Sequence, residues 1–206
     1  MKFLSHLLAS AALVALATSA SAATVFTTKA AFMAQKIAAG AYTETFDAGT
    51  VPADFNFSQG DFSFTVASDP AADGVYDAGG SLGTNFPEDN LVLQFTSGNV
   101  NTVGGDFFAT DAGGGLLDYL SLSFALVYGD GSYDILSPIS ADGSFLGFTS
   151  DKGIAALVIG APFDAVGNPQ YANLDNLTVG RLPEPASLAL AGLALAGLAA
   201  VRRRRI

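Results

Sequence analysis

The 206-residue sequence contains no cysteine and no tryptophan, and its single histidine is His6. Without cysteine, the chain has neither disulfide bonds nor a Cys–His nucleophile pair. Without histidine beyond position 6, a Ser–His–Asp triad, an imidazole general base and the usual zinc sites are excluded from the rest of the chain. Any catalysis would therefore depend on paired carboxylates, as in glycoside hydrolysis.

The carboxylates of the sequence do not single out such a pair. Sixteen of the 19 acidic residues are Asp, and most of them stand beside Gly, Pro or Asn or in other turn-like segments, where Asp forms hydrogen bonds with nearby backbone groups. We therefore expect a protein that is not an enzyme and has no catalytic residues; a glycosidase that uses only carboxylates is the less favoured alternative. The carboxylate pairs considered are Asp130 with Asp134, Asp106 with Asp111, and Glu88 with Asp89.

Basic residues are scarce, and more than half of them lie near the two ends of the chain. Between residues 23 and 181 there are four, against 18 acidic residues, which gives a net charge of about −14. A negative charge of this size opposes binding to nucleic acid or to an anionic membrane. It suits a neutral glycan, a cation such as Ca²⁺ or a solvated surface. The four basic residues are Lys29, Lys36, Lys152 and Arg181.

Residues 1–22 have the pattern of an export signal. Lys2 supplies a positive start, residues 7–17 form an apolar run too short to span a bilayer, and Ala20 and Ala22 form a small-x-small cleavage site. We expect a signal helix that is removed before Ala23, so that the mature chain folds outside the cytoplasm without disulfide bonds.

The C-terminal segment, residues 182–206, combines three features. Pro183, Glu184 and Pro185 end any preceding structure, residues 186–201 are uncharged and rich in Leu, Ala and Gly, and four arginines follow at once. As a helix the apolar run is about 24 Å long, shorter than the ~30 Å hydrocarbon core, so it enters a membrane but is a marginal span. The arginines hold this end on the cytoplasmic side; they are Arg202, Arg203, Arg204 and Arg205.

A Pro-Glu-Pro tripeptide, a short hydrophobic helix and an arginine cluster, behind an export signal, resemble the PEP-CTERM sorting tail of exported bacterial proteins. That tail is also called an ice-binding protein C-terminal domain. In this family, found in Gram-negative bacteria that secrete exopolysaccharide, an exosortase recognises the tail and cleaves near the tripeptide. The resemblance implies that the partners are export machinery and an exosortase-type enzyme. It also implies transient anchoring in the inner membrane through the C-terminal helix, followed by a cell-surface or extracellular location.

Residues 23–181 are enough for one domain. A short helix is expected near its start, capped by Thr28, with an apolar face and a stop at Gly40. The members of that face are Ala30, Ala31, Phe32, Met33 and Ile37. The remainder predicts strands and turns, because apolar and polar residues alternate in short runs separated by Gly, Asp, Asn and Pro.

The expected strands include two with clear alternation, around Phe62–Val66 and Leu91–Phe95. Longer apolar runs cover residues 120–128 and 154–159, and residues 174–179 close the domain. We expect an all-β antiparallel sandwich, jelly-roll-like, with a barrel as the competing architecture. Turns are expected at residues 129–131, 141–143 and 151–153.

Three segments, residues 103–108, 145–150 and 172–180, resemble motifs of jelly-roll-like domains that precede PEP-CTERM tails and look like carbohydrate-binding modules. From the sorting signals and the missing catalytic side chains we expect a non-enzymatic surface or exopolysaccharide (biofilm) matrix protein, with a glycan- or Ca²⁺-binding jelly-roll module as the alternative. Asp175 and Asn176 interrupt the last strand; we interpret them as a bulge or a strand-end polar pair, with cation binding as the alternative.

Candidate ligand-binding residues are few. Tyr128 and Tyr133 flank the 129–131 turn and form the best candidate exposed pair for stacking on a sugar, although core packing is the default for either. Asp69, Asp73 and Asp77 recur every four residues but do not match a helix–loop–helix calcium loop. We expect no cofactor other than Ca²⁺, and we expect exopolysaccharide, not nucleic acid, as a partner.

Overall fold

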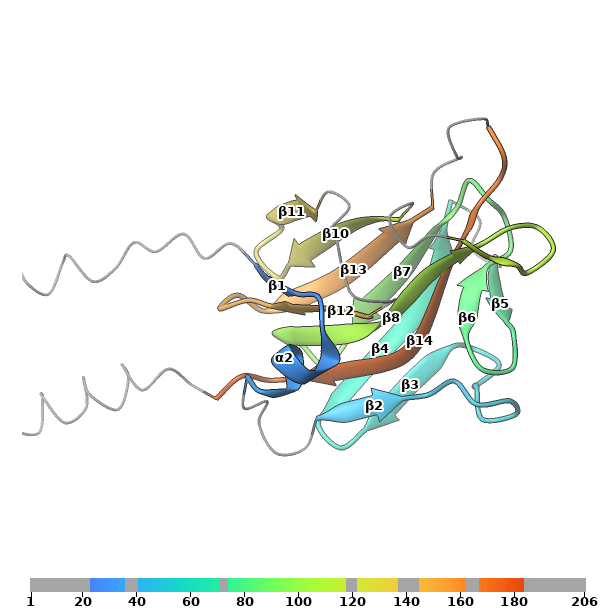
Figure 1. Ribbon diagram of the computed structural model, residues 1–206. Coiled ribbons are helices and arrows are strands. Elements are labelled where there is room, and N and C mark those ends of the chain that lie inside the picture. The colour runs from blue at the N-terminus through green and yellow to red at the C-terminus, as the bar shows by residue number, and fades with distance from the viewer. Residues whose placement is uncertain are drawn as a thin grey trace, which may run out of the picture.

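The computed structural model describes residues 23–35, 41–70, 74–117, 122–136, 145–161 and 167–183 (Figure 1). The predicted signal helix with Ala20 and Ala22, the C-terminal hydrophobic helix, and Glu184, Pro185 and the arginine cluster lie outside these residues. Within the described segments, no helix has the length and apolar character needed to cross a membrane.

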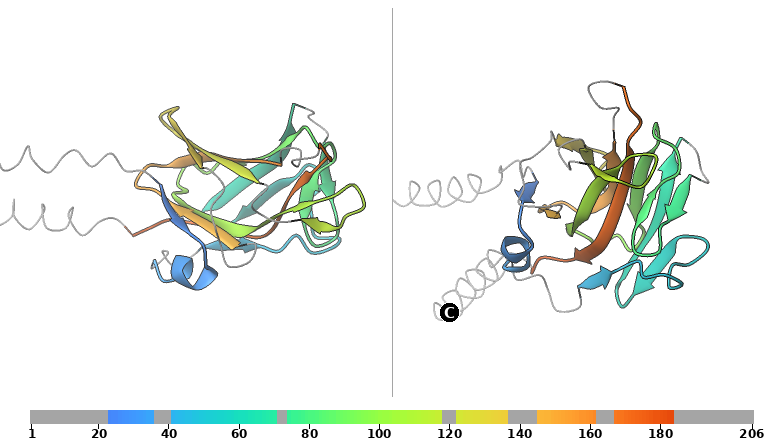
Figure 2. Two further views of the ribbon diagram at one scale, coloured as in Figure 1. Left: turned by 45° about the horizontal axis from the view of Figure 1, so that its top comes forward. Right: turned by 45° about the vertical axis from the view of Figure 1, so that its right-hand side comes forward.

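The described strands form two antiparallel sheets packed face to face (Figure 2). We call the larger one sheet A; its strands run in the order β1-β12-β8-β14-β6-β5, with β2 also beside β14 and β9 beside β8. They are β1 (Thr24–Phe26), β2 (Tyr42–Glu44), β5 (Val75–Asp77), β6 (Leu82–Thr84), β8 (Thr102–Thr110), β9 (Leu116–Leu117), β12 (Phe145–Thr149) and β14 (Tyr171–Gly180).

Sheet B has the order β11-β10-β13-β7-β4-β3. From β7 onward the long strands alternate between the sheets, with β7, β10 and β13 in sheet B and β8, β12 and β14 in sheet A, a winding that is jelly-roll-like. The predicted sandwich is confirmed. The barrel alternative is wrong, because the strands form two separate sheets with open edges. The strands of sheet B are β3 (Asn56–Gln59), β4 (Phe62–Asp69), β7 (Asn90–Phe95), β10 (Ser123–Tyr128), β11 (Tyr133–Leu136) and β13 (Ile154–Gly160).

The core between the sheets is built from alternating strand residues and is rich in phenylalanine. In β4 the residues Phe62, Phe64 and Val66 are buried, as their alternation predicts. Phe57 stacks on Phe64 with ring centroids 4.8 Å apart, and each buried aromatic side chain removes a large apolar area from water. Hydrophobic burial therefore stabilises the domain without covalent cross-links.

The single described helix, α2 (Lys29–Met33), lies on the outer face of sheet A (Figure 1). Thr28 caps it as predicted, with its Oγ1 accepting a hydrogen bond from the Ala31 nitrogen at 3.3 Å. The predicted broad apolar face is wrong: in this helix Phe32 alone is buried, whereas Met33 is 48% exposed. The helix is too short to present more than one side chain to the sheet; Ile37 and Gly40 lie outside the described residues.

Phe32 packs where two strands of sheet A carry glycine. A Cβ atom on Gly147 of β12 would lie 2.4 Å from Phe32 Cδ2, and one on Gly104 of β8 would lie 2.9 Å from the same ring. These distances are shorter than van der Waals contact, so glycine at both positions allows the ring to approach the sheet.

Two of the three predicted turns fall within the described residues and are confirmed. Residues 129–131 connect β10 to β11, with Gly131 at φ +81°, and residues 151–153 connect β12 to β13. The third, at residues 141–143, lies outside them.

Candidate functional site

The bulge predicted at Asp175 and Asn176 is present in β14. This strand pairs with β8 along its length, but the register shifts between Asp175 and Thr178, and Asn176 has φ +50°. On its other side β14 pairs with β6 before the bulge and with β2 after it. The bulge therefore lies where β14 changes partners.

Hydrogen bonds within the bulge explain why the residue at position 176 is Asn176. Its Nδ2 donates to Asp106 Oδ2 and to Asp175 Oδ2, both at 2.9 Å, and its backbone nitrogen donates to Asp175 Oδ1 at 2.6 Å. Burial raises the pKa of Asp175; the backbone N–H of Asn176 opposes this, and the charge of Asp106 adds to it. The Asn176 amide thus bridges two carboxylates, which favours the structural interpretation over cation binding at this pair.

Of the two tyrosines considered for stacking, only Tyr133 is exposed, and Tyr128 takes the core position that was the default for either. Tyr133 is 65% exposed, but Tyr128 is 3% exposed because it shares the inward face of β10 with Phe124 and Leu126. The Tyr128 hydroxyl donates to Asp134 Oδ2 at 2.6 Å. Burial and this carboxylate raise the pKa of Tyr128 to about 12. Tyr128 is therefore part of the core and cannot stack on a sugar.

Four of the carboxylates considered for catalysis, Asp130, Asp134, Asp106 and Asp111, accept local hydrogen bonds. Asp130 Oδ2 forms an ion pair with Lys152 Nζ at 3.0 Å. Hydrogen bonds from Ser132 and then from Lys152 hold the pKa of Asp130 well below its usual range. Asp111 Oδ1 accepts from the backbone nitrogens of Gly113 and Gly115, both at 2.8 Å, and so closes a loop.

Metal ligands are sparse in the described segments. They contain no group of three or more His, Cys, Asp or Glu residues that could hold a metal ion. Of the regularly spaced acids, Asp77 accepts a turn hydrogen bond from the Gly79 nitrogen at 2.8 Å, Asp69 ends β4, and Asp73 lies outside the described residues.

A groove that the sequence analysis missed lies on the outer face of sheet A and has a volume of about 560 Å³. Its aromatic and aliphatic walls include Tyr76, which is 55% exposed, and Leu116, which is 76% exposed. The lining residues are Tyr76, Ala78, Ser81, Thr84, Asn85, Phe108, Thr110, Asp111, Ala112, Gly113, Gly114, Leu116, Tyr171 and Asn173.

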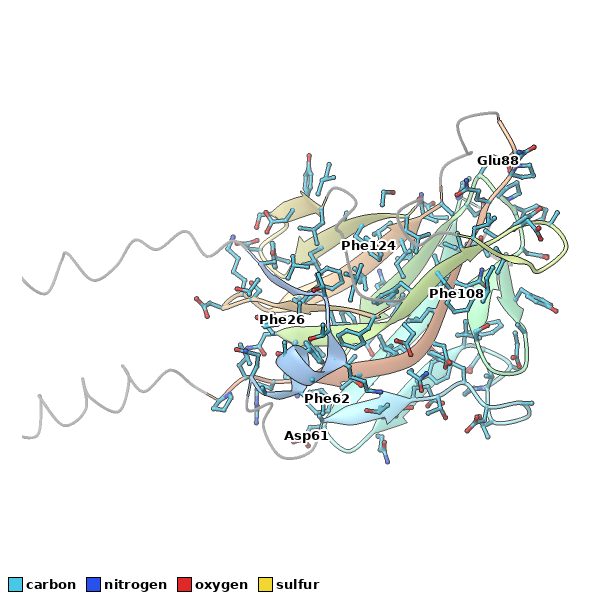
Figure 3. The ribbon with its side chains drawn as sticks, in the orientation of Figure 1. Phe26, Asp61, Phe62, Glu88, Phe108 and Phe124 are labelled. Atoms are coloured by element: carbon cyan, nitrogen blue, oxygen red, sulfur yellow. The ribbon has the colours of Figure 1, made fainter. Side chains whose placement is uncertain are left out.

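Strand register places three residues of the groove in one row with Gly83. Phe108 of β8 is opposite Asn173 of β14, Asn173 is opposite Gly83 of β6, and Gly83 is opposite Tyr76 of β5. Neighbouring strands are about 4.8 Å apart, so the backbones of Phe108 and Tyr76 are about 14 Å apart. This spacing leaves room for a sugar ring between two aromatic walls; Figure 3 labels Phe108.

An amide and a glycine occupy the middle of this row, between Phe108 and Tyr76. A Cβ atom on Gly83 would lie 2.3 Å from Asn173 Oδ1, so the glycine makes room for this amide. Asn173 Nδ2 donates to Thr110 Oγ1 at 3.1 Å and to the Tyr171 carbonyl at 2.9 Å, which fixes the amide. Aromatic rings beside a fixed amide and a hydroxyl can bind a neutral, hydroxyl-rich ligand. Phe108 points outward between the buried residues Phe107 and Ala109. An apolar residue at an outward position of this strand is the sequence feature that could have located the groove.

The described domain begins and ends on the same side of the sandwich (Figure 1). Near its end, the Leu182 backbone nitrogen donates to Asn101 Oδ1 at 2.7 Å. This hydrogen bond holds the chain to the sandwich one residue before Pro183, the first residue of the Pro-Glu-Pro tripeptide.

Structural comparison finds distant similarity to carbohydrate-binding modules. A mutant of CBM29-2, a family 29 carbohydrate-binding module, is 12% identical with a TM-score of 0.39, over 72% of this chain and 95% of that one. The CBM32-1 and CBM32-2 domains of Clostridium perfringens ZmpB, in complex with GalNAc, are 7% identical with a TM-score of 0.33, over 81% of this chain and 42% of that one. The same two domains in another structure give a TM-score of 0.30.

Sequence comparison adds one assignment. Comparison with curated proteins found no match, whereas residues 182–205 match the PEP-CTERM protein-sorting motif. The resemblance inferred for the C-terminal segment is thereby confirmed. The protein thus carries a PEP-CTERM protein-sorting motif at its C-terminus, which implies that it is exported and sorted to the cell surface by an exosortase.

Proposed function

We propose that the sorted domain is a non-enzymatic exopolysaccharide-binding protein of the cell surface or biofilm matrix, and that the groove on sheet A binds a neutral segment of the polysaccharide. The observation that carries this proposal is the row in which Phe108 and Tyr76 flank Asn173 and Gly83. Before processing, the C-terminal helix holds the chain transiently in the inner membrane.

Recognition in this groove combines stacking on aromatic rings with hydrogen bonding to an amide. The apolar face of a sugar ring packs on an aromatic side chain, and Tyr76, Phe108 and Tyr171 supply such side chains. The amide of Asn173, fixed by two hydrogen bonds, faces the hydroxyl groups of the ligand. An ordered amide binds with a smaller entropy cost than a free one.

The charge of the groove supports a neutral ligand. Asp111 is the charged residue among those that line it, and neither Lys nor Arg is among them. An anionic glycan would bring negative charge close to Asp111 and to a domain with a net charge of about −14, which electrostatics disfavours.

The same lining supports binding without hydrolysis. Glycoside hydrolysis by the common mechanisms needs two carboxyl groups, roughly 5–9.5 Å apart. The lining residues supply one, and its Oδ1 already accepts two backbone hydrogen bonds. A ligand in the groove therefore lacks the acid–base pair that cleavage requires.

Calorimetric titration of the mature chain with exopolysaccharide purified from the producing bacterium tests this proposal. We expect Tyr76→Ala and Phe108→Ala each to weaken binding at least tenfold, because each loses a stacking contact of about 0.5–1.5 kcal/mol together with the apolar area that the ligand buries. Tyr133→Ala is the matched control, since Tyr133 is exposed but lies on sheet B. A wild-type chain that does not bind, an equal loss in the control, or new reducing ends in the mixture would contradict the proposal.

A further inference from the structure

A second hollow, of about 320 Å³, lies at the end of sheet B where β7 and β10 begin and β13 ends. Figure 3 labels Glu88 at this end of the sandwich, away from the two ends of the described domain. Four of its seven lining residues carry an oxygen in the side chain, and neither Lys nor Arg is among the lining residues. These residues are Pro87, Glu88, Asp89, Asn90, Ser123, Gly160 and Ala161.

Two side-chain oxygens converge in this hollow. Ser123 of β10 is directly opposite Gly160 of β13, and Gly160 is directly opposite Asn90 of β7, so the three share one face of the sheet. A Cβ atom on Gly160 would lie 2.8 Å from Asn90 Oδ1 and 2.8 Å from Ser123 Oγ. The glycine therefore leaves open the space that the two oxygens surround.

Asp89, which precedes Asn90 in the chain, is also among the residues that line the hollow. Asp89 is 4% exposed, and its Oδ2 has no hydrogen-bond partner within the described part of the chain. Burying an acidic oxygen without a donor or a counter-charge is costly, and the adjacent Glu88 adds a second negative charge. The lining offers no basic side chain to offset either charge.

We propose that this hollow is a Ca²⁺ site, with the Asp89 and Glu88 carboxylates, Asn90 Oδ1 and Ser123 Oγ as its protein ligands. Ca²⁺ accepts mixed carboxylate, amide and hydroxyl oxygens in flexible geometry, whereas Mg²⁺ requires a near-ideal octahedron and zinc prefers nitrogen and sulfur. The ion offsets the charge of Asp89 and links the ends of β7 and β10. This site is on sheet B and does not depend on glycan binding at sheet A.

The test is titration of the mature chain with CaCl₂ after removal of divalent ions by EDTA, followed by calorimetry and thermal unfolding. Extracellular calcium modules have Kd values of about 10⁻⁴–10⁻³ M, and we expect one ion per chain in this range. At a hundredfold excess over Kd, we expect Tm to rise by about 5–10 °C. MgCl₂ at the same concentrations should give a smaller rise.

Two variants assign the binding to this hollow. Asp89→Asn removes the buried charge at nearly constant shape, and Gly160→Ala places a methyl group between the two converging oxygens; each should weaken Ca²⁺ binding at least tenfold. Asp61→Asn, at an exposed turn away from the hollow, is the matched control and should leave Kd unchanged. If Asp89→Asn does not fold, Gly160→Ala and Glu88→Gln provide the same comparison.

The proposal is overturned if the wild-type chain shows neither heat nor a rise in Tm with Ca²⁺. It is also overturned if the response to Mg²⁺ equals that to Ca²⁺, or if Gly160→Ala binds Ca²⁺ as tightly as the wild type.

Discussion

The backbone nitrogen of Ala23 donates a hydrogen bond to Asp134 Oδ2 at 3.4 Å, which joins the chain just before β1 in sheet A to β11 in sheet B. The same oxygen accepts from the Tyr128 hydroxyl at 2.6 Å. Both β1 and β11 are edge strands, so Asp134 links the open edges of the two sheets. Cleavage before Ala23 would convert this backbone nitrogen into a positively charged amino terminus and the hydrogen bond into an ion pair.

The first prediction is that Asp134→Asn destabilises the chain that begins at Ala23 by about 1–2 kcal/mol, because a charged hydrogen bond is lost. A chain that retains one or more residues before Ala23 has no charge on this nitrogen, so Asp134→Asn should lower its free energy of unfolding by a smaller amount. The measurement is urea denaturation of both chains with and without the substitution. Equal losses in the two chains would show that no ion pair forms.

The second prediction concerns Tyr128, whose folded-state pKa is raised from 10.0 to about 12 by burial and by Asp134. The neutral hydroxyl is favoured in the folded state, so this contribution to stability is fully present below pH 10 and is lost as the pH rises toward 12. We expect Tyr128→Phe to be less stable than the wild type at pH 8 and to lose less stability between pH 10 and 12.

Thermal unfolding of both chains between pH 8 and 12 tests this second prediction. Tyr42, whose pKa is also raised by burial and by its hydrogen bond to Glu44, is present in both chains, so the difference between them isolates Tyr128. If Tm falls with pH equally in the two chains above pH 10, the raised pKa does not belong to Tyr128.

The third prediction concerns the bulge in β14. Asn176→Ala should cost about 2–4 kcal/mol, because it removes two hydrogen bonds to carboxylates and places alanine at φ +50°. Asn176→Gly adopts this backbone conformation without strain but still loses the hydrogen bonds, so its free energy of unfolding should lie between those of Asn176→Ala and the wild type. Chemical denaturation measures both, and equal costs for Ala and Gly would show that the backbone conformation does not matter.

The fourth prediction concerns the contact of α2 with sheet A. Gly147→Ala places a methyl group 2.4 Å from Phe32 Cδ2, so either the helix or the strand must shift, at a cost of about 1–3 kcal/mol. Gly153→Ala is the matched control, because a Cβ atom there meets nothing within 4 Å. Denaturation midpoints that fall equally in the two variants would contradict the contact.

Much of the sandwich could be predicted from the sequence because its long strands bury alternate residues. Phe62, Phe64 and Val66 in β4 are an example: with one face buried, the period of two fixes which side chains face the core. The same rule would have placed Tyr128 in the core beside Leu126, but its position next to a turn suggested exposure.

The groove could not be predicted in the same way. Its row of residues depends on the register of four strands, two of which, β5 and β6, have only three residues each. Pairing between Gly83 and Asn173 joins segments about 90 residues apart, and alternation within a segment carries no information about such pairing. The hollow beside Asp89 likewise depends on the pairing of three strands.

The most direct test of the account is the fraction of the exported protein that co-purifies with exopolysaccharide from cultures of the producing bacterium. We predict that the wild type is found in that fraction, with an intact mass that begins at Ala23 and lacks Arg202–Arg205. The double variant Tyr76→Ala/Phe108→Ala should have the same processed mass but remain in the culture fluid. A double variant that co-purifies as fully as the wild type, or a wild-type species that retains the arginines, would contradict the account.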